Sequence, residues 1–321
     1  MRLLSVELSR FRSRRAVVII LIVAAGLAGL LVASAAYDSR PISSSEQSDA
    51  AQRAAQQRAD VQPDYQSCRA DPTAYFDDDT ATKSDCAQIL PQADWFLDRS
   101  ALDLGNELKG RGLTLLVLLA GTAILVGATF AGADWSSGSM SHQLMFVPRR
   151  GRVWTAKAAA VVIGTTVLSA LVVVAFWAVL YGVSASRGLH TPAAVWGNIA
   201  ETSGRGIALA AAVALGSFAV TMLLRHTGAT LGLLFAYAVV GEGLVASLPF
   251  DKMTQWSLPY NVAAWLQDGR QVYDDSLPCG STPGCSSTYV LPLSHAAIYL
   301  GVLLVLAVVV SIVTFRRRDL P

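Results

Sequence analysis

Six stretches of this chain are apolar over about 20 residues, the length of helix that crosses a hydrocarbon core of roughly 30 Å. Hydrophobic residues make up 53% of the 321 residues and charged residues 15%, whereas soluble proteins have about 25% charged residues. These features predict an all-α polytopic membrane protein with six transmembrane helices, and they argue against a soluble nucleic-acid-binding protein or a disordered chain. The predicted spans are residues 16–36, 113–133, 158–183, 206–224, 228–248 and 294–315.

The first span also has a signal-peptide interpretation, because basic residues precede it and small residues follow it. A signal core is usually about 7–15 residues long, whereas this run is longer and is followed by a polar loop and more spans. We therefore expect residues 16–36 to be retained as a membrane anchor.

The distribution of basic residues predicts the orientation of the spans. Six spans place both termini on one side. With the N-terminus inside, 13 Lys and Arg fall in short cytoplasmic segments (1–15, 134–157, 225–227 and 316–321), and the other 12 are spread over three long exterior loops. The formal charge of +2 then divides into +10 inside, −7 outside and −1 for Glu242 within a span. This predicts cytoplasmic termini, and the excess of Arg over Lys suggests the plasma membrane of a high-GC bacterium.

All four cysteines lie in segments predicted to be exterior: Cys68 and Cys86 follow the first span, and Cys279 and Cys285 precede the last. Cysteines confined to one side fit disulfides in an oxidising compartment. Of the three possible connectivities we favour Cys68–Cys86 with Cys279–Cys285, because each pair closes a short local loop. Free, buried thiols are the alternative, and no zinc-ligand spacing is evident.

Three further segments are polar or partly polar. Residues 1–15 alternate apolar and basic residues, which predicts either an interfacial helix with arginines near anionic headgroups or a plain basic flank. Residues 37–112 predict an exterior cap with helices over 43–60 and 94–109. Residues 249–293 are only partly polar and suggest short re-entrant helices, whose irregular backbone must be covered by protein or line a cavity.

The segment between the second and third spans is the most informative part of the sequence. An acid ends the span, and a glycine, a short amphipathic helix, a proline and a basic cluster follow before a lysine opens the next span. These residues are Asp134, Gly138, the predicted 139–146 helix with Met140, Leu144 and Phe146, then Pro148, Arg149, Arg150, Arg152 and Lys157. Such a helix can contact a soluble partner and transmit movement of that partner to the spans.

This order of residues resembles the cytoplasmic coupling region of the type-two (ABC-2) family of ABC transporter permeases. The family pattern runs from an acid through Gly-Thr/Ser-Leu/Met and Pro-x-Ser-Arg to Ala-Lys. The matching positions are Asp134, Gly138, Ser139, Met140, Pro148, Arg149, Arg150, Arg152, Ala156 and Lys157. The acid is Asp where the family more often has Glu, and Gly151 with Arg152 replaces Ser-Arg. The six spans and the N-terminal helix extend the resemblance over nearly the whole chain.

The resemblance implies the permease subunit of an ATP-driven exporter for an amphipathic substrate: a drug, a peptide antibiotic or a lipid. Two permease chains, identical or homologous, would enclose one path, and a separate ABC ATPase dimer would dock on the 139–146 and N-terminal helices. The chain has no G-x-x-x-x-G-K-[ST] phosphate loop, so ATP and Mg²⁺ would bind the ATPase and this chain would not be an enzyme. The arginines after Pro148 would pair either with acids on the ATPase or with lipid headgroups.

Glu242 is the only acid well inside a predicted span. An intramembrane acid is a candidate functional residue, and this one would contact a cationic substrate or mark a helix break. The alternative is a carboxyl that hydrogen-bonds a neighbouring helix. Together with Tyr260 and Asn261 of the re-entrant segment, Glu242 forms the predicted substrate path or gate.

Two other classes of protein fit the same topology. An ion-coupled secondary transporter needs intramembrane ionisable residues and usually internal repeats, but only Glu242 qualifies and no repeat is visible. A membrane sensor or assembly protein would use the exterior loop as a receptor and would need no coupling helix.

Overall fold

The computed structural model describes residues 2–76, 80–97, 99–248, 252–274 and 288–317. The chain forms two compact units: Ala33–Asp103 is the cap, and Met1–Val32 with Leu104–Pro321 is the helical unit. Cys279 and Cys285 lie outside the described residues, so their disulfide remains a prediction.

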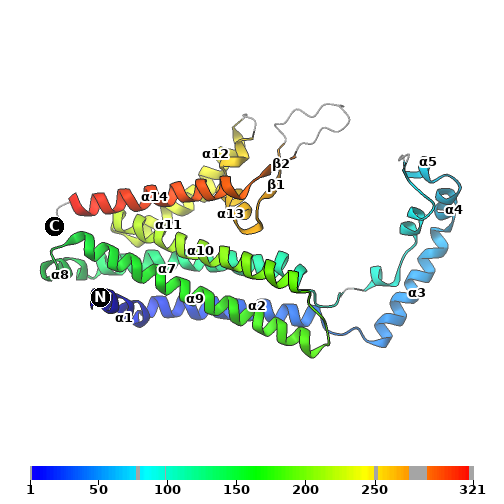
Figure 1. The fold of residues 1–321 in the computed structure, drawn as a ribbon, viewed down its shortest axis with the longest axis horizontal. Helices are drawn as coiled ribbons and strands as arrows, with labels where there is room; N and C mark the ends of the chain where they lie inside the picture. The colour runs from blue at the N-terminus through cyan, green and yellow to red at the C-terminus, as the bar shows by residue number, and fades with distance from the viewer. Residues whose placement is uncertain (1, 77–79, 98, 249–251, 275–287, 318–321) are drawn as a thin grey trace. The chain divides into compact units, whose positions relative to one another are not determined.

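Six helices of the described chain are long and apolar enough to cross a membrane, which confirms the predicted number of spans. They are Arg15–Asp38 (α2), Leu104–Ser136 (α6 Leu104–Glu107, a π-helical turn Leu108–Gly112, and α7 Leu113–Ser136), Arg150–Ser186 (α9), Ala193–Leu224 (α10), Thr227–Val245 (α11 and the helical turns after it) and Leu293–Arg317 (α14). Within the helical unit, α1 (Arg2–Ser13), α8 (Ser139–Phe146) and the last turn of α14 lie at the same end (Figure 1).

The helices α9 and α10 extend well beyond the predicted spans, because polar residues interrupt the hydropathy without ending the helix. α9 has 37 residues, or roughly 55 Å at about 1.5 Å per residue. α10 begins at Ala193 rather than at residue 206, and Glu201 and Arg205 pair across one of its turns at 2.5 Å. Both helices exceed a hydrocarbon core of roughly 30 Å.

The apolar core of the helical unit lies where α7, α9 and α10 meet. Phe130, Trp154 and Phe218 are buried there, with the Trp154 and Phe218 rings 5.5 Å apart. The backbones of α7 and α10 approach closely at Gly127, where an added Cβ would overlap the Ala214 carbonyl oxygen. This close approach explains why the position is a glycine.

Two tryptophans of α9 hold it against different neighbours. Trp154 Nε1 donates to Ser311 Oγ of α14, and Trp177 Nε1 donates to Ser203 Oγ of α10, each at 3.2 Å between buried groups. A buried donor left without an acceptor costs roughly 1–3 kcal/mol. Rotation of α9 about its own axis would break both bonds.

The chain between α10 and α14 begins with a tight turn. Arg225 ends α10 in the left-handed conformation (φ 59°), and His226 Nδ1 accepts from the backbone N–H of Ala229 at the start of α11 (Thr227–Ala236). The predicted helical hairpin is therefore present. α11 then continues through a π-helical turn, Tyr237–Gly241, into α12, whose bounds are Glu242–Ser247.

A small sheet corrects the all-α prediction. After a 3₁₀ turn (Met253–Trp256) and α13 (Leu258–Gln267), strand β1 (Arg270–Tyr273) pairs antiparallel with β2 (Thr288–Leu291). Val272 and Leu291 are buried while their strand neighbours are more exposed, the alternation expected of a half-buried strand. The partly polar region before the last span is therefore a mixture of helix and hairpin.

The cap contains the helix predicted over residues 43–60. Its elements are α3 (Ser44–Asp60), α4 (Gln62–Ala70), α5 (Pro72–Phe76) and 3₁₀ turns at Asp85–Ile89 and Ala93–Phe96. The Cys68–Cys86 disulfide joins α4 to the first 3₁₀ turn, which confirms that pairing. The helix predicted over 94–109 is wrong: α6 begins only at Leu104, directly after Asp103, because Ser and Asp favour helix starts over helix interiors.

A capping box begins α3. Ser43 Oγ accepts from the Glu46 backbone N–H at 3.3 Å, and Glu46 Oε2 accepts from the Ser43 backbone N–H at 2.9 Å. This backbone donor, followed by the Ser43 hydroxyl and the Arg99 guanidinium, holds the pKa of the Glu46 carboxyl below its ordinary value. A lowered folded-state pKa means that the stabilisation is complete above the ordinary glutamate pKa and is lost as pH falls through the lowered one.

Acidification from about pH 7 to about pH 3 should therefore increase hydrogen exchange in the first turn of α3, after correction for the intrinsic exchange rate. A Glu46→Gln variant should lose this pH dependence but keep part of the protection, since its amide oxygen still accepts. Asp60→Asn, at the other end of α3, is the matched control. Equal pH dependence in the wild type and the Glu46→Gln variant would contradict the assignment.

Candidate functional site

The candidate site is built where α1, α7, α8 and α9 meet. α7 ends at Ser136, and Gly138 takes a positive φ of 67° as it begins α8. This conformation is easily accessible only to glycine. A single non-helical residue, Arg14, separates α1 from α2, so the side chains of α1 and Arg14 reach the end of α7.

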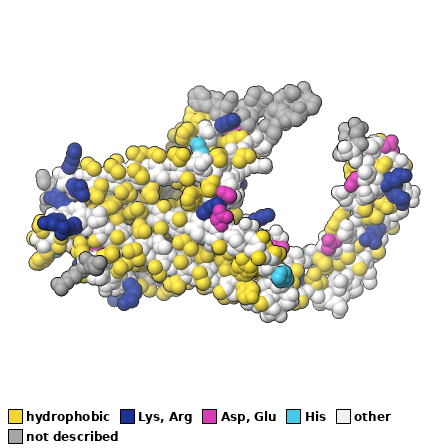
Figure 2. Space-filling model, viewed as in Figure 1, with side chains coloured by type: hydrophobic (Ala, Val, Ile, Leu, Met, Phe, Trp, Pro, Cys, Tyr) yellow, Lys and Arg dark blue, Asp and Glu magenta, His cyan; other side chains and the backbone are white. Residues whose placement is uncertain are grey.

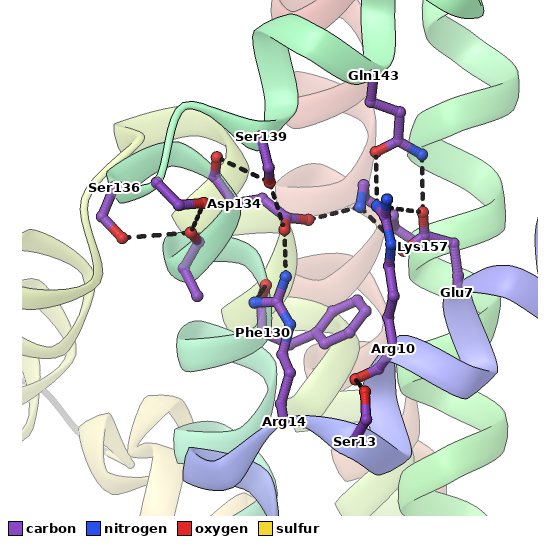
Figure 3. A network of polar contacts seen from close by, with 12 residues as sticks. Glu7, Arg10, Ser13, Arg14, Phe130, Asp134, Ser136, Ser139, Gln143 and Lys157 are labelled. Carbon is purple, nitrogen blue, oxygen red and sulfur yellow. Dashed lines mark hydrogen bonds and ion pairs between the residues drawn. The ribbon is translucent and has the colours of Figure 1, made fainter.

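Lys157 of α9 lies at the centre of the site and is completely buried. Its Nζ donates to Glu7 Oε2 of α1 at 2.9 Å and to Asp134 Oδ2 of α7 at 2.5 Å (Figure 3). Both carboxylates are also buried. Burying an isolated ammonium costs several kcal/mol, and close carboxylates with further hydrogen bonds offset that cost.

Four other groups complete the hydrogen bonds of the two acids. Arg14 pairs with Asp134 Oδ1 and donates to the Phe130 carbonyl at 2.8 Å. From α8, Ser139 Oγ donates to Asp134 Oδ1 at 3.0 Å and Gln143 Nε2 donates to Glu7 Oε1 at 2.7 Å. Arg10 lies at the partly exposed edge, 3.4 Å from Glu7. We call Glu7, Arg14, Asp134, Ser139, Gln143 and Lys157 the ionic junction.

The ionic junction is electrically balanced, with two carboxylates facing Lys157 and Arg14. The side chains come from three helices and from the break between α1 and α2, while α8 contributes two neutral donors. A displacement of α8 must therefore stretch hydrogen bonds to both acids. The positions of α1, α7, α8 and α9 are thus linked through these contacts.

α1 differs from the predicted interfacial helix because one of its faces is buried in protein. Phe11 is only 3% exposed and its ring lies against Gly164 of α9, about two helical turns beyond Lys157. Glu7 lies one turn before Phe11 on the same face. Ser5, Ser9 and Ser13 remain exposed, as the predicted polar face requires.

The apolar residues of α8 divide between two faces. Met140 and Leu144 are buried in the core, at 0% and 8% exposure. Phe146 is 86% exposed and Met145 is 70% exposed. Of the three apolar residues named for the predicted helix, two are thus buried, and the exposed pair is Met145 and Phe146.

The basic cluster does not join the ionic junction. Pro148 leads into α9, Arg149 caps it, and Arg150 and Arg152 are in its first turn. They line a separate hollow together with Arg316 from the end of α14.

The predicted gate residues lie on the segment between α11 and β1. Glu242 Oε2 accepts from Ser257 Oγ at 2.6 Å, and Oε1 accepts from the backbone N–H of Leu258, the first residue of α13, at 2.9 Å. The carboxylate therefore caps the N-terminus of α13, where the helix dipole favours a negative charge. The helix continues through the π-helical turn and Glu242 rather than breaking there, and the predicted hydrogen bond to a neighbouring helix is present.

Asn261 and Tyr260 lie in the first turn of α13 but have different surroundings. Asn261 is fully buried, and its Nδ2 donates to the Gln255 and Ser257 carbonyls at 2.7 and 2.8 Å. Tyr260 is half-buried, with the Arg270 guanidinium 5.8 Å from its ring centroid. Glu242 and Asn261 therefore both lie at the start of α13, where each forms a hydrogen bond with Ser257.

Sequence reasoning named Asp134 and Lys157 but missed Glu7, Arg14 and Gln143. A signal for Glu7 was present, because it is the sole acid in the first 37 residues. Its position, one helical turn from both Leu4 and Phe11, also places it on the apolar face, where a carboxylate needs a partner.

Within the described ranges, no group of three or more His, Cys, Asp or Glu could hold a metal ion. A scan against models of protein families, a search of curated proteins and a search of solved structures each found no match.

Replacing Lys157 should destabilise the protein strongly. Lys157→Met leaves the buried Glu7 carboxylate with only the partly exposed Arg10 as a cation, at an expected cost of roughly 3–5 kcal/mol. The Glu7→Gln, Lys157→Met double variant should recover part of this loss, because the unpaired charge is gone. Denaturant unfolding in detergent measures each variant.

Glu201→Gln, which breaks an exposed ion pair on α10, is the control and should cost no more than about 1 kcal/mol. Additive losses in the double variant would show that Glu7 and Lys157 do not interact.

Replacing Glu242 should destabilise the first turn of α13 without affecting α8. Glu242→Gln keeps one acceptor for two donors and removes charge-assisted hydrogen bonds worth about 1.5–3 kcal/mol. Hydrogen exchange of the first-turn amides of α13 should rise, while α8 stays unchanged. Unchanged exchange at α13 would refute the capping role.

Proposed function

We propose that this chain is the permease subunit of an ATP-driven ABC exporter and that a separate ATPase drives it through α8. The observation that carries the proposal is α8 itself: a short helix between two candidate spans, with an exposed apolar pair at its C-terminal end and two side chains, Ser139 and Gln143, that hydrogen-bond the ionic junction. The match of its residues to the type-two permease pattern supports the same role.

The exposed pair has the properties of a docking surface. Phe146 and Met145 are exposed on a helix that is not among the candidate spans. Aromatic residues and Met are enriched at protein interfaces. We assign them to contact with the ATPase.

The buried and partly buried residues of α8 offer a route for the movement. Met140 and Leu144 anchor α8 in the core, and Ser139 and Gln143 hydrogen-bond the acids that hold Lys157. Because packed cores and ionic networks shift between discrete arrangements rather than deform smoothly, a push on Phe146 would re-tilt α1, α7 and α9 together. Closure of an ATP-loaded ATPase dimer would supply that push.

The proposed orientation puts the α8 end of the helical unit in the cytoplasm of a bacterium and the cap outside. Its support is the density of Lys and Arg in the short segments at that end, which Figure 2 displays as dark blue side chains. The Cys68–Cys86 disulfide supports an oxidising exterior for the cap.

The rest of the proposal rests on the family resemblance. A second permease chain, the same or homologous, would complete the path, ATP and Mg²⁺ would bind the ATPase, and the substrate would be amphipathic. Glu242 and Asn261 fix the start of α13 on the exterior side of the path, where a gate would lie.

Affinity purification of the tagged chain from its native membrane should recover an ATPase with a phosphate loop. The Phe146→Ala, Met145→Ala variant should lower ATPase recovery about tenfold or more, as expected when a central apolar anchor is removed. Phe235→Ala is the matched control, because Phe235 is 71% exposed but lies on α11. Recovered ATPase activity, with and without the variant, gives the second readout.

Equal recovery with the α8 and α11 variants would place the interface elsewhere. Recovery of no ATPase from any sample would reject the permease proposal in favour of a membrane sensor or assembly protein.

A further inference from the structure

Four arginines line one hollow at the α8 end of the helical unit. Arg149, Arg150 and Arg152 come from the start of α9, and Arg316 comes from the last turn of α14. The hollow has a volume of about 510 Å³, and none of the described residues that line it is acidic. Segments from distant parts of the sequence thus concentrate positive charge at one place.

Within the described part of the chain, the charge at this hollow is largely uncompensated. Among the described residues, the ion pairs involve none of Arg149, Arg152 or Arg316. Arg149 and Arg152 also lie at the positive end of the α9 dipole, where cations are destabilising and anions are favoured. Binding of an anion in the hollow would therefore stabilise this cluster of arginines.

Gly151 shapes the hollow. An added Cβ at this position would lie 2.8 Å from Arg316 Nη2 and 3.0 Å from its Nε. With no side chain at position 151 the Arg316 guanidinium lies against the first turn of α9, and an added Cβ would require this guanidinium to shift. A planar guanidinium held in this way can donate two parallel hydrogen bonds to a phosphate.

The position of the hollow indicates the source of the phosphate. α9 and α14 are both candidate spans, and the arginines occupy the ends of these helices. The ends of spans lie at the level of lipid headgroups, and basic pockets between transmembrane helices bind anionic headgroups. We infer that Arg149, Arg152 and Arg316 bind the phosphate of an anionic phospholipid at the α9–α14 junction. This site does not depend on the proposed ATPase partner.

Two pairs of variants distinguish binding at this site from a general attraction between basic residues and anionic lipids. Arg316→Gln is compared with Arg317→Gln, which removes the same charge from the next residue, one that does not line the hollow. Gly151→Ala displaces Arg316 without changing the charge, and Gly197→Ala in α10, where nothing lies within 4 Å, is its control. All four positions are tested in the full-length chain in detergent.

Binding of short-chain phosphatidylglycerol, phosphatidylcholine and inorganic phosphate is measured by native mass spectrometry and thermal shift. Phosphatidylglycerol should bind most tightly. Arg316→Gln and Gly151→Ala should each weaken its binding about tenfold, or roughly 1.4 kcal/mol, while Arg317→Gln and Gly197→Ala change it less than about twofold.

Equal losses for Arg316→Gln and Arg317→Gln would overturn the site in favour of non-specific attraction. Equal binding of inorganic phosphate and phosphatidylglycerol would overturn the lipid as its ligand. If the variants leave lipid binding intact but lower ATPase recovery, the arginines contact acids on a protein partner instead. Because the variants leave α8 unchanged, failure of this site would not affect the α8 proposal.

Discussion

The buried ammonium of Lys157 sets the geometry of the helical unit. The apolar core around Phe130 and Phe218 packs α7, α9 and α10 together. The buried cation adds a second constraint, because it needs its carboxylates within hydrogen-bonding distance. Since Glu7 and Asp134 come from different helices, meeting that requirement fixes α1, α7 and α9 together. The donors on α8 then fix the short helix to the same point.

The parts of this structure that are predictable from sequence have local causes. Length and hydropathy suffice to find six candidate spans, and Gly138 and Pro148 bracket α8 because one permits a positive φ and the other interrupts helix. The capping residues at Ser43 likewise locate the start of α3. The Cys68–Cys86 pairing is predictable because only a short loop separates the two cysteines.

What sequence could not predict depends on tertiary contacts. The spacing of Met140, Leu144 and Phe146 gives an apolar helix but does not say which face meets the core, and the structure buries the first two and exposes the third. Asp134 and Lys157 were each recognised, yet their contact and the insertion of Glu7 between helices required three-dimensional placement. The role of Glu242 was open because its partners, Ser257 and Leu258, lie beyond the end of its own helix.

The indole contacts of α9 restrict how the helical unit can change conformation. Trp154 ties one end of α9 to α14 and Trp177 ties the other end to α10. The two attachment points lie roughly 35 Å apart along the axis, at about 1.5 Å per residue. The orientation of α9 is therefore tied to both α14 and α10. A change that tilts α9 alone must break at least one of these hydrogen bonds, whereas a change that keeps both must move α10 and α14 together with α9.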